Sequence, residues 1–549
     1  MIRSTTTPST QVIPGKKAVI VTPHCLASQA GRDVLNKGGN AAQAIVAAVS
    51  TLAVVYPHAN GLGADGFLLL RQKGKNPVGI NASGPAAALA NAQDYLSRGC
   101  TSIDNRGSRA VLTVPGGVSG LQKMLDLSRE WEGEQLPLPQ LLAAARLYAK
   151  EGFPVSASQA RLAHTKLNQL CNVPGFSNTF CRNGIPFSEG EVMKQHLLSN
   201  TLSRLAEKGL DEFYRGETGR ILSAFLEKQG STLRWSDFKN YQAQICPPLS
   251  INTREATLYN LDAPTQGMTS LGILGTFARL SEAHPKSAFG NMRCESFAHI
   301  HGLVECAKPF YTLRNHYITD PKHMSIEPKT FLSEEKLVDM AKQIRPQRAL
   351  AWPTGGTDGD TVWIGCLDAY GNSVSAIYSL AWEFGSGLVC PETGVLFANR
   401  GTYFSLDANH ANVLRPGKLT YQTLNPAMAI FHDGREMVYG SMGGEGQPQF
   451  QSAIYSRYGI FRLPLAEAVN APRWALGKTR GDSHTSLKLE NRFGSNLIEQ
   501  LRQAGHNVEV LPEAFSEAAG QAGAAVRQEN GTVEGAADIH RSPGSAEYA

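Results

Sequence analysis

The interpretation of this 549-residue sequence begins at Gly355-Gly356-Thr357-Asp358-Gly359-Asp360-Thr361-Val362-Trp363-Ile364. Here a polar, glycine-rich segment runs directly into an apolar strand, and Thr361 stands at the junction. On local sequence alone, a β-branched residue that begins a strand needs no further explanation. The alternative is a chain that is cut between Asp360 and Thr361, so that Thr361 becomes a new N-terminus.

A new N-terminus at Thr361 would have a definite chemistry. A threonine hydroxyl is a poor nucleophile near neutral pH and needs a base. A free α-amino group has a pKa of about 7.7–8.0, so it can take the hydroxyl proton directly or through water. The same hydroxyl could first attack the Asp360 carbonyl carbon, and hydrolysis of the resulting ester would release the amine. This hypothesis predicts a self-cleaving chain with a threonine nucleophile.

A second glycine-rich segment, Gly440-Ser441-Met442-Gly443-Gly444-Glu445-Gly446, follows an expected strand at 437–439. Consecutive glycines let backbone N–H groups converge on one point, as an oxyanion hole requires. An ordinary structural turn would explain the same glycines equally well.

The order of expected elements indicates the class of fold. Residues 1–16 are predicted to be a loose arm, 120–350 a mainly helical middle, and the part after 361 rich in strands. The turn at 368–372 predicts a hairpin. This order favours an α+β fold of the sandwich type. Helices are expected at 27–37, 41–56, 139–151 and 291–308, and strands at 67–71, 361–367, 373–380, 394–398, 427–431 and 437–439.

Composition excludes several classes of protein. The 52 basic and 47 acidic residues leave a net charge of only +5 without a dense basic block, so no nucleic-acid partner is expected. No signal-peptide pattern and no sufficiently long apolar run appear, so a cytoplasmic protein without a membrane partner is expected. The nine cysteines form no CxxC pair, which favours reduced thiols.

Two patterns imitate cofactor sites. Residues 61–66 fit GxGxxG, but a helix precedes them and a strand follows, the reverse of a dinucleotide-binding unit, so a tight turn is expected. His299, His301 and Glu305 suggest a metal, yet only His301 and Glu305 share a helical face. Neither a metal nor an organic cofactor is therefore expected.

Segments from about residue 17 to residue 540 resemble, in order, the gamma-glutamyltranspeptidase family of N-terminal nucleophile hydrolases. The resemblance implies a four-layer αββα sandwich built from two subunits of one cleaved precursor, residues 1–360 and 361–549. The two subunits would form a heterodimer, alone or as a dimer of heterodimers. The segments that carry the resemblance are 35–41, 56–67, 114–120, 262–267, 360–361, 384–387, 424–426 and 440–444.

The resemblance also implies roles for catalytic residues. Thr361 would be the nucleophile, with Asp360 on the other side of the cleaved bond. Gly443 and Gly444 fall on the family's oxyanion glycines, and Ser379 falls where a threonine hydrogen-bonds the nucleophile.

Departures from the family pattern concern the substrate. The segment 81–85 lacks the arginine that holds the α-carboxylate of γ-glutamyl substrates. The aspartate that holds the α-ammonium falls on Tyr403, and two carboxylate-binding serines fall on Gln422 and Thr423. A site without an acidic group has no counter-charge for an ammonium.

Asn399-Arg400-Gly401 brings a guanidinium to a wall of the implied substrate site, although a lone arginine also fits a surface ion pair. The segments 399–407, 423–427 and 440–447 are similar to the oxamate amidohydrolase branch. The substrate implied is a small anionic amide, with oxamate hydrolysed to oxalate and ammonia. Two alternatives stay open: a γ-glutamyl hydrolase or transpeptidase acting on glutathione-like compounds, and an unprocessed, inactive binding protein.

Overall fold

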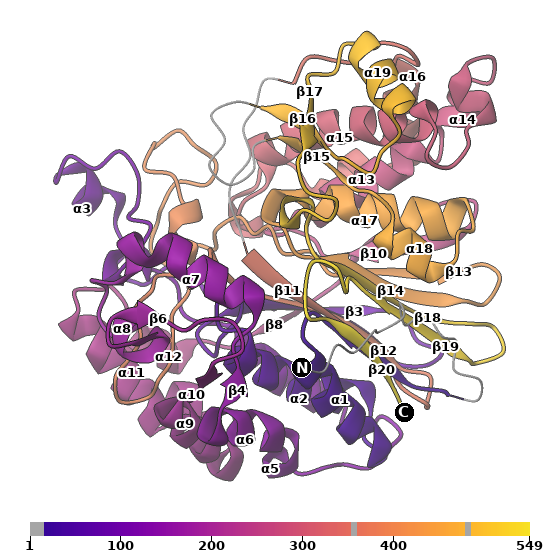
Figure 1. Ribbon diagram of the computed structural model, residues 1–549. Helices are drawn as coiled ribbons and strands as arrows, with labels where there is room; N and C mark the ends of the chain where they lie inside the picture. Colours follow the sequence, from indigo (N-terminus) through magenta and orange to yellow (C-terminus); the bar gives the residue numbers. More distant parts are fainter. Residues whose placement is uncertain (1–15, 353–359, 478–484) are drawn as a thin grey trace.

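The computed structural model describes residues 16–352, 360–477 and 485–549. Almost all of the expected arm at 1–16 lies outside these residues. Two antiparallel sheets form the centre of the described chain (Figure 1). The first has the order β20 (Ser545–Tyr548), β1 (Val19–Thr22), β11 (Asp360–Leu367), β12 (Ser373–Ala381), β2 (Asp65–Arg71), β3 (Val78–Ala82) and β8 (Gln244–Cys246). The second has the order β19 (Val533–Ala537), β18 (Ala522–Arg527), β14 (Glu436–Ser441), β13 (Ala427–Phe431), β10 (Ala256–Asn260) and β9 (Leu249–Asn252).

The two sheets pack face to face, because side chains alternate along each strand. Trp363 of β11 joins an apolar cluster with Val438 of β14 and Ala525 of β18. Val362 and Ile364, on the opposite face of β11, join the cluster that contains α2. A Cβ on Gly440 would lie 2.1 Å from the Trp363 ring, so this position needs glycine for the sheets to approach.

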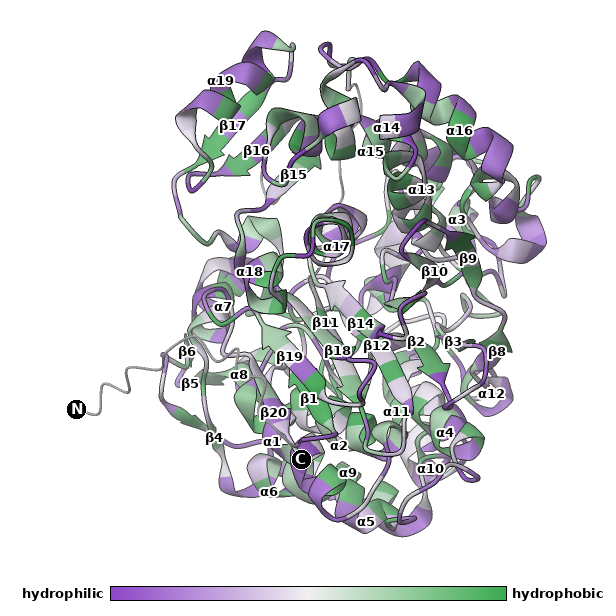
Figure 2. Cartoon of the chain, turned by 90° about the vertical axis from the view of Figure 1, so that its right-hand side faces the viewer, coloured by the Kyte–Doolittle hydropathy of each residue, from purple (hydrophilic) through white to green (hydrophobic). Residues whose placement is uncertain are grey.

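Helices cover the outer face of each sheet, which gives the four layers αββα expected from the resemblance (Figure 1). The first sheet is covered by α1 (Cys25–Asn36) and α2 (Ala41–Val55), and α2 is buried along its whole length. The second is covered by α13 (Gly267–Phe277), α17 (Gln447–Tyr455) and α18 (Leu465–Asn470). Figure 2 shows hydrophobic residues on the central strands, whereas the outlying helix α19 (Ser495–Gln503) mixes both kinds.

Two further groups of elements flank the sandwich. One contains α14 (Leu280–Ala283), α15 (Phe297–Tyr317), α16 (Glu334–Gln343), α19 and a small sheet of β15 (Trp474–Gly477), β16 (Ser486–Glu490) and β17 (Val508–Leu511). The other contains α3 (Ala92–Leu96), α4 (Gly117–Leu127), α5 (Leu138–Leu141), α6 (Ala143–Glu151), α7 (Ala157–Leu170), α8 (Phe176–Phe180), α9 (His196–Lys208), α10 (Glu212–Arg215), α11 (Glu217–Lys228), α12 (Trp235–Asn240) and the strand pairs β4 (Phe153–Pro154) with β7 (Val192–Met193) and β5 (Cys181–Arg182) with β6 (Ile185–Pro186). No helix in the described ranges combines the length and hydropathy needed to cross a bilayer.

Most expected elements are present, and the differences have local causes. The β11–β12 hairpin is confirmed, as is the helix-to-strand order around 61–66. The helix expected at 139–151 is interrupted at Leu142, whose ψ of 2° is not helical. The helix expected at 291–308 begins only at Phe297, because the Ser296 side chain caps it by accepting from the His299 amide. The strand expected at 394–398 is wrong: Leu396 and Phe397 form only isolated bridges.

Candidate active site around Thr361

Thr361 is the second residue of β11 and is buried. Asp360 pairs with Ala381 and Val362 with Tyr378, so a bulge sets Thr361 against two residues of β12, Ser379 and Leu380. Bulges next to active sites serve to re-aim a side chain. The Ser379 hydroxyl accepts from the Ala381 amide at 2.8 Å, which holds this end of β12 in place.

The glycine turn after β14 lies on the same side of the first sheet as Thr361. Met442 and Gly523 line a small cavity together with Thr361 and Trp363. The backbone turns at Gly443 and Gly444, whose φ angles of 117° and 51° are left-handed. The side-chain Nε2 of Gln447, just beyond the turn, lies 3.5 Å from the Thr361 hydroxyl. The structure therefore brings both expected glycines to the side of the sheet that carries Thr361.

Gln266, the N-cap residue of α13, holds this turn in place through hydrogen bonds of its side chain. Its amide nitrogen donates to the carbonyls of Gly444 at 2.9 Å and Thr423 at 2.6 Å. Its amide oxygen accepts from Arg314 at 2.9 Å, and Arg314 also pairs with Glu445 at 2.9 Å. The turn is thus held by side chains from two helices, α13 and α15.

Gly443→Ala tests the turn directly. A Cβ at Gly443 would meet the Phe450 ring at 2.7 Å, so the turn must shift as well as bear a left-handed alanine. We expect kcat to fall about 10²-fold, as when an oxyanion donor is displaced. The matched control is Gly417→Ala, at φ +70 with nothing within 4 Å of the new Cβ. Gly417→Ala should lose about 1–2 kcal/mol of stability in urea titrations and Gly443→Ala at least as much, but only Gly443→Ala should lose turnover. Equal kcat for the two would contradict the assignment.

Arg400 is fully buried at the start of the short 3-10 helix Arg400–Tyr403. Its Nε donates to Asp65 at 3.3 Å, and Asp65 is the register partner of Ser379 on β12. The other Asp65 oxygen accepts from the amides of Gly84 and Gly116. Burial raises the pKa of Asp65, while the charge of Arg400 opposes that rise.

The terminal nitrogens of Arg400 have no hydrogen-bond partner among the described residues. The same holds for both polar atoms of the buried Gln422 side chain, which also lies close enough to Asp65 to lower its pKa. Buried polar groups are normally satisfied by protein, water or ligand. The ring of Tyr403 lies 5.1 Å below the guanidinium and adds a favourable cation–π contact. The site therefore holds buried donors that have no partner among the described residues. Arg400, Gln422, Asp65 and Tyr403 are here called the Arg400 corner.

The remaining expected residues surround the same corner. The Asn399 side chain accepts from the Trp382 amide at 3.0 Å and donates to the Asn105 carbonyl at 2.9 Å, so it fixes the chain ahead of Arg400. Thr423 is buried and its carbonyl is held by Gln266. Direct substrate contact by Asn399 or Thr423 stays a prediction. Asp360 begins β11, and the segment 353–359 before it lies outside the described residues.

Two larger cavities are lined in part by residues of the glycine turn. One of about 350 Å³ is lined by Trp382, Tyr403, Tyr421 and Glu445. The other, of about 620 Å³, is lined by Gly443, Ser542 and other residues. Both thus border the turn, whereas Thr361 lines the small cavity described above.

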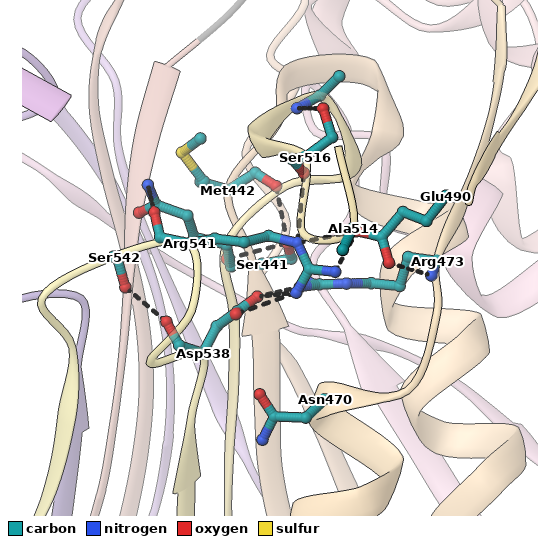
Figure 3. A network of polar contacts seen from close by, with 12 residues as sticks. Ser441, Met442, Asn470, Arg473, Glu490, Ala514, Ser516, Asp538, Arg541 and Ser542 are labelled. Atoms are coloured by element: carbon teal, nitrogen blue, oxygen red, sulfur yellow. Dashed lines mark hydrogen bonds and ion pairs between the residues drawn. The ribbon is translucent and has the colours of Figure 1, made fainter. Parts of the chain in front are cut away.

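A buried ionic network stabilises the wall of the second cavity (Figure 3). Arg541 pairs with Asp538 at 2.8 Å and with Glu490, and Arg473 pairs with Asp538. Burial and the charge of Arg541 lower the pKa of Arg473 to about 10. Ser542, which follows Arg541 in the chain, lines both this cavity and the small one at Thr361. The network thus positions a loop behind the nucleophile.

Arg541→Met should destabilise the fold by about 3–5 kcal/mol, because it leaves two buried carboxylates short of a partner. The control is Arg129→Met, which breaks an ion pair whose arginine is 72% exposed and should change stability by less than about 0.5 kcal/mol. Urea titration of both variants measures the difference. A loss below about 1 kcal/mol for Arg541→Met would show that the network is not structural.

One known protein family matches almost the whole chain. The profile of the family described as Gamma-glutamyltranspeptidase matches residues 27–548. The chain belongs to the gamma-glutamyltranspeptidase family. Membership makes it an N-terminal nucleophile hydrolase that acts on amide bonds, as the resemblance predicted.

Individual known proteins are similar to this chain over nearly their whole length. The oxamate amidohydrolase proenzyme of Klebsiella pneumoniae subsp. pneumoniae is 45% identical over 528 residues, 96% of this chain and 98% of that protein. The glutathione hydrolase-like YwrD proenzyme of Bacillus subtilis is 36% identical over 525 residues, 95% and 97% of the two chains. The crystal structure of cephalosporin acylase from Bacillus halodurans has a TM-score of 0.87 at 30% identity, and the match covers 100% of this chain and 98% of that one.

Sequence reasoning about this family member missed three residues of the site: Asp65, Gln266 and Gln447. Each stands inside a segment that the sequence had already singled out, 61–66, 262–267 or 440–447. A signal was therefore present, since each is a polar residue among glycines and small residues. What it contacts depends on partners far along the chain, such as Arg400 for Asp65.

Proposed function

We propose that this chain is a self-processing amidohydrolase that cuts itself between Asp360 and Thr361 and then hydrolyses oxamate to oxalate and ammonia. The observation that carries the choice of substrate is the buried Arg400 guanidinium, whose terminal nitrogens have no partner among the described residues. The 45% identity to an oxamate amidohydrolase proenzyme supports the same substrate.

The chain's own groups and water account for each step. The Thr361 hydroxyl attacks the oxamate amide carbon, and its proton passes to the α-amine of the same residue. The amides of Gly443 and Gly444 stabilise the oxyanion that forms. The protonated amine gives its proton to the leaving nitrogen, so ammonia departs and an oxalyl ester remains. Water, deprotonated by the amine, cleaves that ester to oxalate and restores the hydroxyl.

Charge at the Arg400 corner favours oxamate over a γ-glutamyl compound. Two terminal guanidinium nitrogens can hold one carboxylate bidentately. An α-ammonium group would need a free acid, but Asp65 is paired with Arg400 and Glu445 with Arg314. Tyr403, at the position of the family's aspartate, faces the guanidinium instead.

The test is release of ammonia and oxalate from oxamate by the purified protein, whether it is found cleaved or intact, with glutathione and a glutaryl amide as competing substrates. We expect the highest kcat/KM for oxamate. A higher value for glutathione would replace the substrate assignment with the γ-glutamyl alternative. An intact single chain with no hydrolysis of any of the three would favour the inactive binding protein.

A further inference from the structure

Helix α15 carries three polar residues, His301, Glu305 and Lys308, that are all buried. Spacings of four and three residues set them along one face of the helix. Charged side chains are almost never fully buried unless they are paired. The reaction proposed above uses none of the three, so their role needs another explanation.

Glu305 and Lys308 together hold both backbone groups of Leu350. The Lys308 ammonium donates to Glu305 at 2.5 Å and to the Leu350 carbonyl at 2.6 Å. The second Glu305 oxygen accepts from the Leu350 amide at 2.8 Å. The ion pair is therefore completed by the chain that runs past it.

His301 extends this attachment toward residue 345. One ring nitrogen lies 2.9 Å from the Arg345 carbonyl, and the other lies 2.8 Å from a ring nitrogen of His506. Two residues past Leu350, the Trp352 ring packs edge-on against Tyr311 of the same helix at 5.8 Å. Residues 345–352 are thus fastened along α15 at several points. The three helix residues His301, Glu305 and Lys308 are here called the α15 clamp.

The same cluster could be mistaken for a metal site, since ligand atoms of His301, Glu305 and His506 lie within 4.8 Å of one another. Both Glu305 oxygens, however, already accept from Lys308 and Leu350, and both His301 nitrogens have protein partners. The Lys308 ammonium would also repel a cation. The cluster therefore binds the segment 345–352 and not a metal ion.

The position of the clamp in the sequence shows what it can act on. Leu350 stands ten positions before Asp360, and Thr361 on the other side of that bond is fixed by β11. We propose that the α15 clamp anchors the chain ahead of the cleavage site. It shortens the free connection that leads into Asp360 before the cut and keeps residues 345–352 packed against α15 afterwards. Fixing both ends of a short connection reduces the conformations that compete with the reactive one. This inference rests on the proposed self-cleavage.

Leu350→Pro tests the clamp without altering α15, because it removes the amide that Glu305 accepts from. It also fixes the backbone φ angle at residue 350. The Leu350 side chain is 39% exposed, so Leu350→Ala is a matched control that keeps the amide. Each precursor is made by cell-free synthesis, and its splitting is followed by intact mass spectrometry. We expect Leu350→Pro to split at least about tenfold more slowly than Leu350→Ala and the unaltered chain. Once split, it should hydrolyse oxamate with the same kcat per processed chain, which general misfolding would not allow.

Hydrogen exchange gives a second measurement. In a Thr361→Ala background, amides in 345–352 should exchange slowly, and adding Leu350→Pro should remove that protection. The double substitution Glu305→Gln with Lys308→Met replaces the ion pair by neutral groups of similar size and should act in the same direction. If the unaltered chain splits and Leu350→Pro splits at the same rate, the clamp's role is wrong while the proposed function stands. If the unaltered chain never splits, self-cleavage and the clamp's role in it are both wrong.

Discussion

Thr361→Ala is expected to give a single uncleaved chain that hydrolyses no oxamate. The substitution removes the hydroxyl that attacks first the Asp360 carbonyl and then the substrate, so both reactions lose their nucleophile. Removing the nucleophile of a Ser-His-Asp triad lowers kcat by about 10⁶-fold, and we expect a loss of at least about 10⁴-fold for this N-terminal nucleophile. Intact mass spectrometry under denaturing conditions and an ammonia assay measure the two effects separately.

Thr361→Ser is the control for this experiment. Serine keeps a hydroxyl and, after cleavage, the same α-amine, so fragments meeting at residues 360 and 361 should still form, together with measurable activity. Because Thr361 is buried at a bulge, the missing methyl group should slow both reactions without abolishing them. Cleavage of Thr361→Ala at the same bond would contradict the nucleophile assignment, whatever the activity of the serine variant.

Arg400→Met is expected to lower kcat/KM for oxamate by about 10²–10³-fold, because truncating one partner of a buried charge pair typically costs about 2–5 kcal/mol of binding. The methionine fills similar space but offers no donor to the substrate carboxylate. Oxamide, in which a neutral amide replaces that carboxylate, provides the comparison. The ratio of kcat/KM for oxamate to that for oxamide should be large in the unaltered enzyme and fall toward one in the variant.

The Asp65 carboxylate is the reason for a second variant. Arg400→Met leaves Asp65 buried without its ion-pair partner, which by itself destabilises the fold. The double substitution Arg400→Met with Asp65→Asn removes that buried charge and should recover stability in a urea titration without recovering preference for oxamate. An unchanged oxamate-to-oxamide ratio in both variants would show that another group binds the carboxylate.

Local patterns predicted much of the fold. The hairpin that begins at Thr361 was predictable because two apolar runs flank a polar turn with Gly371. The capped helix α2 was predictable from Asn40 and the small residues after it, since a capping box forms there. The strand expected at 394–398 failed because an apolar run does not say whether a sheet edge is free to accept it.

By itself, the sequence determined the identity of the nucleophile candidate, the two glycines that could face it and the family, because these signals lie in contiguous segments. The tertiary structure alone decided how the Arg400 corner is built. Asp65 meets Arg400 across 335 positions, and Gln266 reaches Gly444 across 178. Such contacts depend on the register of β2 against β12 and on the packing of α13 behind the turn. Register and packing are set by the burial of whole sheet faces, so no short stretch of residues specifies them.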